Sequence, residues 1–164
     1  MRVFKEEQRI TQTWLMTLIC IIVIFTTITF TKNFINDKID FLSYLYMLSV
    51  VLIPCILIFI FKLKTRIDET GIHYQFYPIH LKMKSILWKD IKHAETRTYH
   101  ALLEYGGWGL RNGFFFGKKG TAINIKGNMG IQLILNDNKK ILIGTQKKFD
   151  ADNSISRYLH KNQL

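Results

Sequence analysis

Two long stretches without a charged residue constrain this chain more than any other feature of its sequence. No charged residue occurs between Arg9 and Lys32, and a second uncharged run extends from Phe41 to Phe61. A helix needs roughly 20 apolar residues to cross a bilayer core about 30 Å thick, and most core helices and strands of soluble proteins are shorter. The sequence therefore predicts two transmembrane helices, with spans at about 11–31 and 41–61.

The first stretch also begins like a secretory signal, because basic residues precede it. Its apolar run is longer than the roughly 7 to 15 residues of such a signal, and no small-x-small cleavage pattern follows at 30–33. A second apolar run comes directly afterwards. These features favour an uncleaved anchor. Cys20 and Cys55 lie within the predicted spans, where they are expected to act as small apolar residues.

The two predicted helices must run antiparallel, because only the nine residues Lys32–Asp40 connect them. Lys and Arg near span ends favour the cytoplasmic side. Six of them flank the outer ends and two lie in the connection: Arg2, Lys5, Arg9, Lys62, Lys64 and Arg66 against Lys32 and Lys38. We therefore expect a protein of the cytoplasmic membrane with both termini in the cytoplasm. The spans contain no acidic, basic or histidine side chain, which argues for an anchor rather than an ion or substrate path.

Beyond residue 64 the pattern changes to short alternating apolar runs, which are typical of β-strands. In Thr121–Thr145, isoleucine and leucine recur at every second position, and Gly, Asn and Asp separate the runs. This segment predicts a three-stranded antiparallel meander. Arg66–Asp68 and Ile72–Tyr77 predict a hairpin around Glu69-Thr70-Gly71, and further strands are expected at 86–91 and 92–99.

The tail from Asp150 to Lys161 predicts a helix with Asp150 or Asp152 as its N-cap. Its apolar side consists of Ala151, Ile155, Tyr158 and Leu159. The expected fold is thus a membrane α-helical hairpin, residues 1–64, followed by a mainly-β domain, residues 65–164. The domain is expected to be a small barrel or curled antiparallel sheet that the C-terminal helix caps.

Four sequence features together resemble a known family: an Asp-Glu-Thr-Gly-Ile hairpin at 68–72, Trp-Lys-Asp-Ile at 88–91, Tyr-Gly-Gly-Trp-Gly-Leu-Arg at 105–111, and the glycine-bounded strands after Gly127. The chain is similar to bacterial pleckstrin-homology-like domains carried behind two transmembrane helices. The resemblance covers about Lys64–Leu164 together with the hairpin arrangement. It implies a partly open barrel capped by the C-terminal helix, and it implies more about fold than about activity.

Charge and aromatic residues indicate where the domain would make contacts. From Lys62 onward there are 18 Lys and Arg and 8 Asp and Glu, so this part carries 18 − 8 = +10. Such a charge favours anionic lipid headgroups, although a composition rich in Ile, Lys, Asn and Phe also raises the lysine count without selection for a partner. The candidate contact residues lie in one segment: Trp108, Arg111, Phe114, Phe115, Phe116, Lys118 and Lys119. Neighbouring side chains of a strand point to opposite faces, so at least one of the three phenylalanines needs a partner outside the core.

Other kinds of site find little support in the sequence. The Gly106–Gly120 segment is not a phosphate-binding loop, because Asn112 and Lys119 stand where that motif requires Gly and Ser or Thr. A bend at Gly107 and Gly109, with Trp108 packed on the sheet, is the structural alternative. Histidines 73, 80, 93 and 100 lack metal-site spacing, and neither a nucleophile elbow nor a nucleic-acid motif is present. We therefore expect no cofactor, metal, catalysis or nucleic-acid partner.

These features favour a membrane-anchored binding or scaffolding module whose domain contacts anionic lipid headgroups or a protein partner at the cytoplasmic face. Two alternatives stay open. In the first, the chain would be an accessory subunit whose hairpin packs in a larger membrane complex. In the second, it would be a membrane-bound enzyme whose site is not visible in a single sequence.

Overall fold

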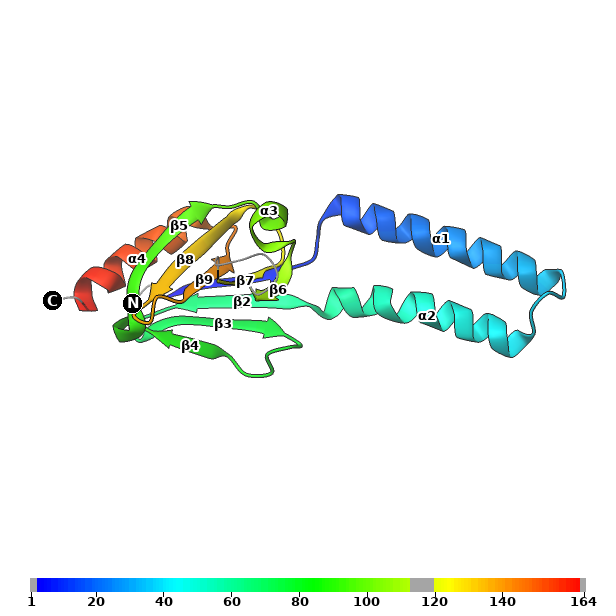
Figure 1. Ribbon diagram of the computed structural model, residues 1–164, viewed down its shortest axis with the longest axis horizontal. Coiled ribbons are helices and arrows are strands. Elements are labelled where there is room, and N and C mark those ends of the chain that lie inside the picture. The colour runs from blue at the N-terminus through cyan, green and yellow to red at the C-terminus, as the bar shows by residue number, and fades with distance from the viewer. Residues whose placement is uncertain (1–2, 113–119, 163–164) are drawn as a thin grey trace. The chain divides into compact units, whose positions relative to one another are not determined.

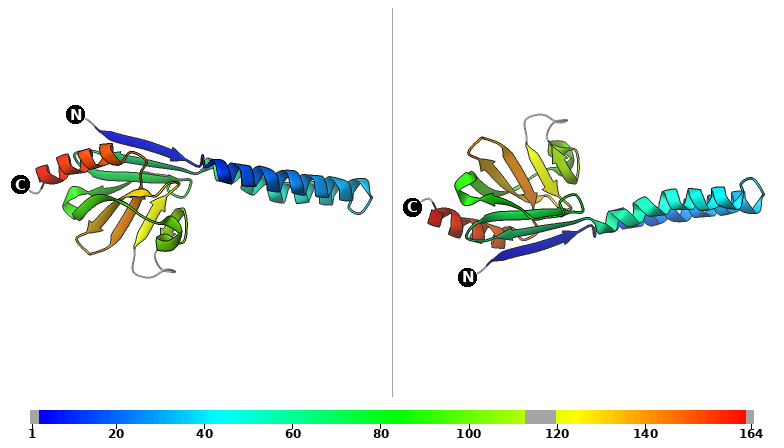
Figure 2. Two further views of the ribbon diagram at one scale, coloured as in Figure 1. Left: turned by 90° about the horizontal axis from the view of Figure 1, so that it is seen from above. Right: turned by 90° about the horizontal axis from the view of Figure 1, so that it is seen from below.

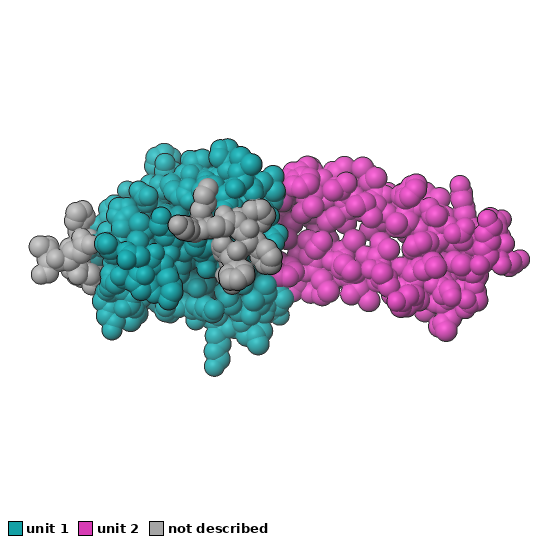
Figure 3. Space-filling view, in the orientation of Figure 1, with its two compact units in different colours: residues 1–9, 62–164 teal, residues 10–61 magenta. Residues whose placement is uncertain are grey.

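The computed structural model describes residues 3–112 and 120–162 of the 164-residue chain. The chain divides into two compact units, which Figure 3 shows in different colours. Residues 10–61 form the hairpin unit, and residues 1–9 together with 62–164 form the β unit. The hairpin unit is therefore an insertion within the β unit, whereas sequence analysis placed the whole of residues 1–64 with the helices.

The hairpin unit consists of helices α1 (Thr13–Ile35) and α2 (Phe41–Ile60) (Figure 1). Both are long and apolar enough to cross a membrane, which confirms the two predicted helices. The first helix ends four residues later than the predicted span. Asp40 caps the second helix, because its carboxylate accepts hydrogen bonds from the backbone N–H groups of Leu42 and Ser43 at 3.1 and 3.3 Å.

The two helices contact each other near the connection between them. The rings of Phe34 and Tyr44 stack with centroids 5.1 Å apart, and the hydroxyl groups of Thr31 and Tyr44 share a hydrogen bond of 3.2 Å. Although the structure describes every residue of both helices, it buries none of them, and Phe25 and Leu42 are among the most exposed apolar side chains. So much apolar surface requires a covering of lipid or protein.

The β unit contains two sheets. The first has the strand order β1-β2-β3-β4, and all its pairs are antiparallel. Its strands are β1 (Phe4–Arg9), β2 (Lys62–Ile67), β3 (Gly71–Tyr77) and β4 (Lys84–Leu87). The predicted hairpin is therefore confirmed as β2 and β3. Gly71 is required there, because a Cβ atom at this position would collide with the backbone oxygen of Ile86.

Strand β1 was not expected from its polar sequence, Phe-Lys-Glu-Glu-Gln-Arg. Its alternate residues Phe4, Glu6 and Gln8 are nevertheless buried. The Glu6 carboxylate accepts hydrogen bonds from the Thr145 hydroxyl at 2.6 Å and from the backbone N–H of Gln146 at 2.8 Å. The Gln8 amide donates to the backbone oxygen of Gly144 at 2.8 Å. These distant partners stabilise polar groups that would otherwise be costly to bury.

The second sheet has the strand order β5-β8-β9-β7-β6. Its strands are β5 (Ile91–Thr98), β6 (Gly109–Asn112), β7 (Thr121–Asn124), β8 (Met129–Leu135) and β9 (Lys140–Gly144). The prediction of a meander over 121–145 is wrong in its topology. Strands β8 and β9 form the expected hairpin, but β7 pairs with β9 in parallel. Alternation of apolar residues identifies strands and their buried faces. The order of the strands in the sheet depends instead on which strands pair, and alternation does not show this.

The β unit is built from two sheets rather than from one curled sheet. Ile67 and Ile72 of the first sheet, and Ile131 and Ile143 of the second, are fully buried. A smaller apolar cluster covers the other face of the second sheet beside helix α3 (Ala101–Tyr105): Tyr99, Ala101, Tyr105, Ala122 and Leu142, with Trp108 packed against them.

The predicted C-terminal helix is confirmed as α4 (Lys148–Asn162). Its expected apolar positions Ala151, Ile155 and Tyr158 are buried. The helix begins before Asp150, so neither Asp150 nor Asp152 is its N-cap; Asp152 instead accepts a hydrogen bond of 2.6 Å from the Thr96 hydroxyl.

Tyr158 stacks on Trp88 with centroids 6.2 Å apart. Trp88 belongs to a short 3₁₀ helix, η1 (Trp88–Asp90), that interrupts the strand expected at 86–91. The indole N–H of Trp88 donates to the backbone oxygen of Asp68 at 2.8 Å.

Candidate functional site

One end of the β unit is defined by the two residues at which the chain leaves it and returns. Arg9 ends β1, Lys62 begins β2, and the two are paired in antiparallel register. Tyr77, the last residue of β3, is paired with Lys62 in turn. The loop between β3 and β4, residues 78–83, therefore also lies at this end of the first sheet.

Helix α3 lies at the same end of the β unit, as both views of Figure 2 show. The contacts agree with the pictures. The side chain of Gln8, the residue before Arg9, donates a hydrogen bond to Gly144, and Gly144 is paired with Gly130 of β8. Just before β8, the backbone oxygen of Asn128 accepts a 2.7 Å hydrogen bond from the backbone N–H of Tyr99, which lies two residues before α3. We call this surface, consisting of residues 78–83 and α3, the exit rim.

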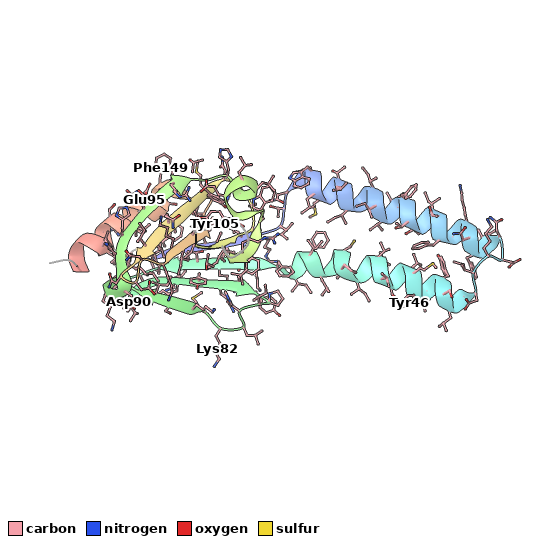
Figure 4. All side chains as sticks on the ribbon, viewed as in Figure 1. Tyr46, Lys82, Asp90, Glu95, Tyr105 and Phe149 are labelled. Atoms are coloured by element: carbon pink, nitrogen blue, oxygen red, sulfur yellow. The ribbon has the colours of Figure 1, made fainter. Side chains whose placement is uncertain are left out.

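Four large apolar side chains of the exit rim are more than half exposed. The exposed fractions are 54 % for Ile79, 78 % for Leu81, 64 % for Leu102 and 80 % for Leu103. Lys82 lies between Leu81 and Met83 in the loop, and Figure 4 shows its side chain pointing away from the strands. A surface that combines apolar groups with a cation is suited to a contact with an apolar, anionic partner.

The loop part of the exit rim is held in a defined shape. The Gln75 amide donates to the backbone oxygens of His80 and Leu81 at 3.2 and 2.8 Å, and the backbone N–H of His80 donates to the Phe76 oxygen at 2.7 Å. The His80 ring packs edge-on against Tyr74 with centroids 5.8 Å apart. Burial, followed by the charge of Lys84, lowers the pKa of His80. The exposed leucine and isoleucine are thus presented by an ordered loop.

Of the seven contact residues predicted from sequence, the structure describes Trp108 and Arg111; Phe114, Phe115, Phe116, Lys118 and Lys119 lie outside the described residues. Trp108 is half-buried on the small cluster beside α3, and its indole N–H donates to the Gly127 oxygen at 3.2 Å. Arg111 is exposed, and its Nε donates to the Trp108 oxygen at 3.3 Å. Trp108 is therefore mainly a packing residue, whereas Arg111 presents charge at the surface.

The expected bend at the glycine-rich segment is present. Gly106, Gly107 and Gly109 have φ values of 71°, 123° and 112°, which residues with a Cβ rarely adopt. Gly106 ends α3, and the backbone N–H of Gly109 donates to the Asn124 side-chain oxygen at 2.9 Å. Asn124 donates in turn to the hydroxyl of Tyr99, and burial raises the pKa of that hydroxyl to about 12. The segment thus fixes α3 on the second sheet.

A polar hollow of about 310 Å³ lies on the second sheet beside α3. Arg97 is one of its lining residues and forms a two-pronged ion pair with Glu104 at 2.9 and 3.3 Å. The same guanidinium donates to the Tyr105 hydroxyl and to the Gln132 side-chain oxygen, each at 3.2 Å. The hydrogen bond to Glu104 raises the pKa of Arg97. Because these internal partners already occupy the guanidinium, the hollow fits a structural role that ties α3 to β5 and β8.

A second hollow, of about 560 Å³, lies between β1 and α4. Lys5, Lys147 and Arg157 line it, together with Asp150. It is a cationic surface at the part of β1 remote from Arg9. It is therefore distinct from the exit rim.

A serine, a histidine and an aspartate form a line on the outer face of the first sheet. Nδ1 of His73 lies 2.7 Å from Oγ of Ser85, and its Nε2 lies 3.0 Å from Oδ1 of Asp68. This order resembles a hydrolase relay, but Ser85 lies within strand β4 opposite His73 rather than at a sharp turn that presents a nucleophile. Arg66 also pairs with Asp68 at 2.8 Å. The geometry therefore supports a network that closes the β2–β3 turn.

We expect the Asp68→Asn substitution to lower the free energy of unfolding by about 1–2 kcal/mol at pH 7. Burial opposes ionisation of this carboxyl, but hydrogen bonds from Thr70 and His73 hold its pKa well below the ordinary value of 3.8. Because the pKa is depressed in the folded state, this stability is present above about pH 4 and is lost as the pH falls further. Urea unfolding of the full-length protein in detergent micelles at several pH values measures the difference.

The solvent-exposed Asp137→Asn variant is the matched control for this measurement. Its stability should stay close to that of the parent protein. If the free energies of unfolding of the parent protein and the Asp68 variant differ by the same amount as the pH falls further and further below 4, the stabilising role of the ionised Asp68 carboxylate is contradicted.

The four histidines singled out by sequence analysis do not converge. His73 and His80 belong to the separate networks described above, His93 lies 3.5 Å from Glu95, and His100 precedes α3. Within residues 3–112 and 120–162, no group of three or more His, Cys, Asp or Glu side chains is arranged to hold a metal ion.

The class defined by this fold is an apolar two-helix hairpin inserted between the first two strands of a two-sheet β domain. The chain matches no protein-family model and no curated protein sequence. Its function must therefore be inferred from its own residues.

The exit rim was not predicted from the sequence. The available signal was the segment Pro-Ile-His-Leu-Lys-Met-Lys at 78–84, in which apolar and basic residues alternate directly after a strand, and the adjacent pair Leu102-Leu103. Neither feature indicates from sequence alone that the two segments lie at one end of the domain.

Proposed function

We propose that this chain is a membrane-anchored, non-catalytic binding module. The hairpin unit spans the cytoplasmic membrane as two antiparallel helices, and the β unit is a pleckstrin-homology-like domain that contacts anionic lipid headgroups at the cytoplasmic face. The pairing of Arg9 with Lys62 carries this proposal. This pairing supports a hairpin whose two ends connect to adjacent strands. Both ends of the hairpin would then lie on one side of the bilayer, and two chain connections would join the β unit to it.

Three further observations support the proposal. Both helices meet the length and composition needed for spanning, and none of their described residues is buried. Two sheets with a C-terminal helix packed on their core are compatible with a pleckstrin-homology-like domain. The basic residues flanking the spans favour the cytoplasmic side.

Charge at the exit rim supports the headgroup contact. Lys62 and Lys82 lie at this end, and Glu104 of α3 is paired with Arg97. Four further acidic residues lie at the opposite turns of the sheets: Asp68, Glu69, Asp90 and Asp137. Each cation placed close to an anionic membrane surface contributes about 1 kcal/mol. Two such cations would favour anionic over neutral lipid around the protein roughly tenfold or more.

The test is lipid selectivity of the full-length protein in vesicles. Spin-labelled phosphatidylglycerol and phosphatidylcholine are compared by the fraction of each that the protein immobilises. We expect a preference for phosphatidylglycerol that weakens at high salt, and that the double substitution Lys62→Glu, Lys82→Glu removes.

The double substitution Lys89→Glu, Lys92→Glu is the control. It makes the same change in net charge at exposed positions of η1 and β5, at the other end of the β unit. Its lipid preference should equal that of the parent protein. Equal immobilisation of the two lipids by the parent protein at low salt would rule out the headgroup contact.

A further inference from the structure

We propose that the exit rim inserts Ile79, Leu81, Leu102 and Leu103 into the interface of the bilayer, so that one loop and one short helix of the β unit contact lipid in addition to the hairpin. This inference rests on the proposed function, because it requires that the hairpin spans the membrane. It adds a second, non-covalent attachment and names the residues that make it.

Connectivity of the chain sets the depth of the exit rim. Helix α2 ends at Ile60 and β2 begins at Lys62, so only Phe61 separates a membrane-spanning helix from the sheet. Two residues reach at most about 7 Å when fully extended. The end of β2 that carries Lys62 must therefore lie at the level of the headgroups.

The register of the first sheet places the loop between β3 and β4 at the same end as Lys62. Tyr77 is the partner of Lys62, and Nζ of Lys62 lies 5.0 Å from the centre of the Tyr77 ring. The chain continues past Tyr77 into the loop before it returns in β4. Ile79 and Leu81 thus follow directly on the strand end that is paired with Lys62. A tyrosine ring beside a lysine is also the pairing expected at the boundary between headgroups and acyl chains.

Helix α3 reaches the same level from the second sheet. The contacts from Gln8 through Gly144 and Gly130 place it at the end of the β unit that carries Arg9. Its inward side packs through Ala101 and Tyr105, which are buried. Its outward side carries Leu102 and Leu103, which are adjacent and exposed.

The chemistry of the exit rim favours lipid over water. Four aliphatic side chains that are more than half exposed come from only two short segments, and each segment is held by internal contacts. Aliphatic groups gain from entering the acyl boundary, while Lys62 and Lys82 keep their charged ends among the headgroups. A bilayer is the one apolar, anionic surface that the proposed anchor brings to this place.

The experiment measures insertion by single labelled cysteines in the full-length protein. Cys20 and Cys55 are replaced by alanine, and an environment-sensitive nitrobenzoxadiazole dye is attached at Leu81→Cys or Leu103→Cys. Vesicles contain phosphatidylcholine and phosphatidylglycerol, with or without lipids that carry a quenching nitroxide near the headgroup. We expect blue-shifted emission and strong quenching at both positions.

Phe149→Cys is the matched control, because Phe149 is an equally exposed apolar residue, 81 %, on α4 and away from the exit rim (Figure 4). Its dye should emit as in water and should not be quenched. Ile53→Cys, in the middle of α2, reports on the hairpin itself and should be quenched by nitroxides placed deep in the acyl chains.

The outcomes separate the two proposals. Quenching at position 53 without quenching at 81 and 103 would overturn insertion of the exit rim while the anchor stands. Absence of deep quenching at position 53 would overturn the anchor and the inference together. A blue shift at 81 and 103 that depends on protein concentration, without quenching by lipid, would assign the exit rim to contacts between protein copies and would also overturn insertion.

Discussion

Replacing residues 10–61 with the dipeptide Asn-Gly is expected to give a soluble, cooperatively folded β unit. Arg9 and Lys62 are paired in antiparallel register, and Asn-Gly is a favoured two-residue connection between antiparallel strands. The hairpin contributes no strand to either sheet, so the core of the β unit stays complete. Circular dichroism, gel filtration without detergent and urea unfolding measure the result.

Residues 62–164 without β1 provide the contrast, and we expect that chain to aggregate or to remain unfolded. It lacks the strand that pairs with β2, the buried Phe4 and the hydrogen bonds of Glu6 and Gln8 to residues 144–146. The combined loss is at least about 5 kcal/mol, which is comparable to the whole stability of a small domain. Cooperative unfolding of both chains at similar urea concentrations would show that β1 is dispensable.

A finer comparison uses single substitutions in the Asn-Gly chain. Glu6→Ala should cost about 2–4 kcal/mol, because the Thr145 hydroxyl and the Gln146 N–H lose their buried acceptor. Glu7→Ala, on the exposed face of the same strand, should change the stability by less than about 1 kcal/mol.

The second large effect concerns the side of the membrane on which each segment lies. In a protein without Cys20 and Cys55, a cysteine at Lys38 in the connection between the helices should react with a membrane-impermeant maleimide in intact cells. A cysteine at Glu69 in the β2–β3 turn should react only after the membrane is opened. The expected difference is almost all-or-none, because a charged reagent does not cross the apolar core.

The pattern of labelling distinguishes errors of topology from errors of orientation. Reaction at both positions in intact cells, or at neither, would contradict a hairpin that spans the membrane. Reaction at Glu69 with protection of Lys38 would keep the hairpin and reverse its orientation. Lys139→Cys, in another turn of the β unit, must behave like Glu69 in either case.

Sequence patterns predicted the elements whose signals are local. The absence of charge identified α1 and α2, the Glu-Thr-Gly turn identified β2 and β3, and spacing of apolar residues identified α4 with buried Ala151, Ile155 and Tyr158. Each of these features depends on residues within about one element of one another. They also correspond to patterns that sequence shows directly, namely a long uncharged apolar run or apolar residues on one face.

Features that depend on distant partners were missed. Glu6 and Gln8 make β1 look like an exposed polar segment, because their buried partners lie more than 130 residues away in the chain. The parallel pairing of β7 with β9 cannot be distinguished from a meander by alternation alone. The exit rim was missed for the same reason, since register and not sequence order brings the β3–β4 loop and α3 to one end.

The insertion of the helices between β1 and β2 also determines the order in which the protein is made. The first strand leaves the ribosome before either helix, but its partners at 144–146 follow 136 or more residues later. Both helices have therefore been synthesised, and can enter the bilayer, before the β unit is able to close. If the hairpin spans the membrane as proposed, final folding of this domain is then an event at the membrane surface, with its first strand already held beside the bilayer.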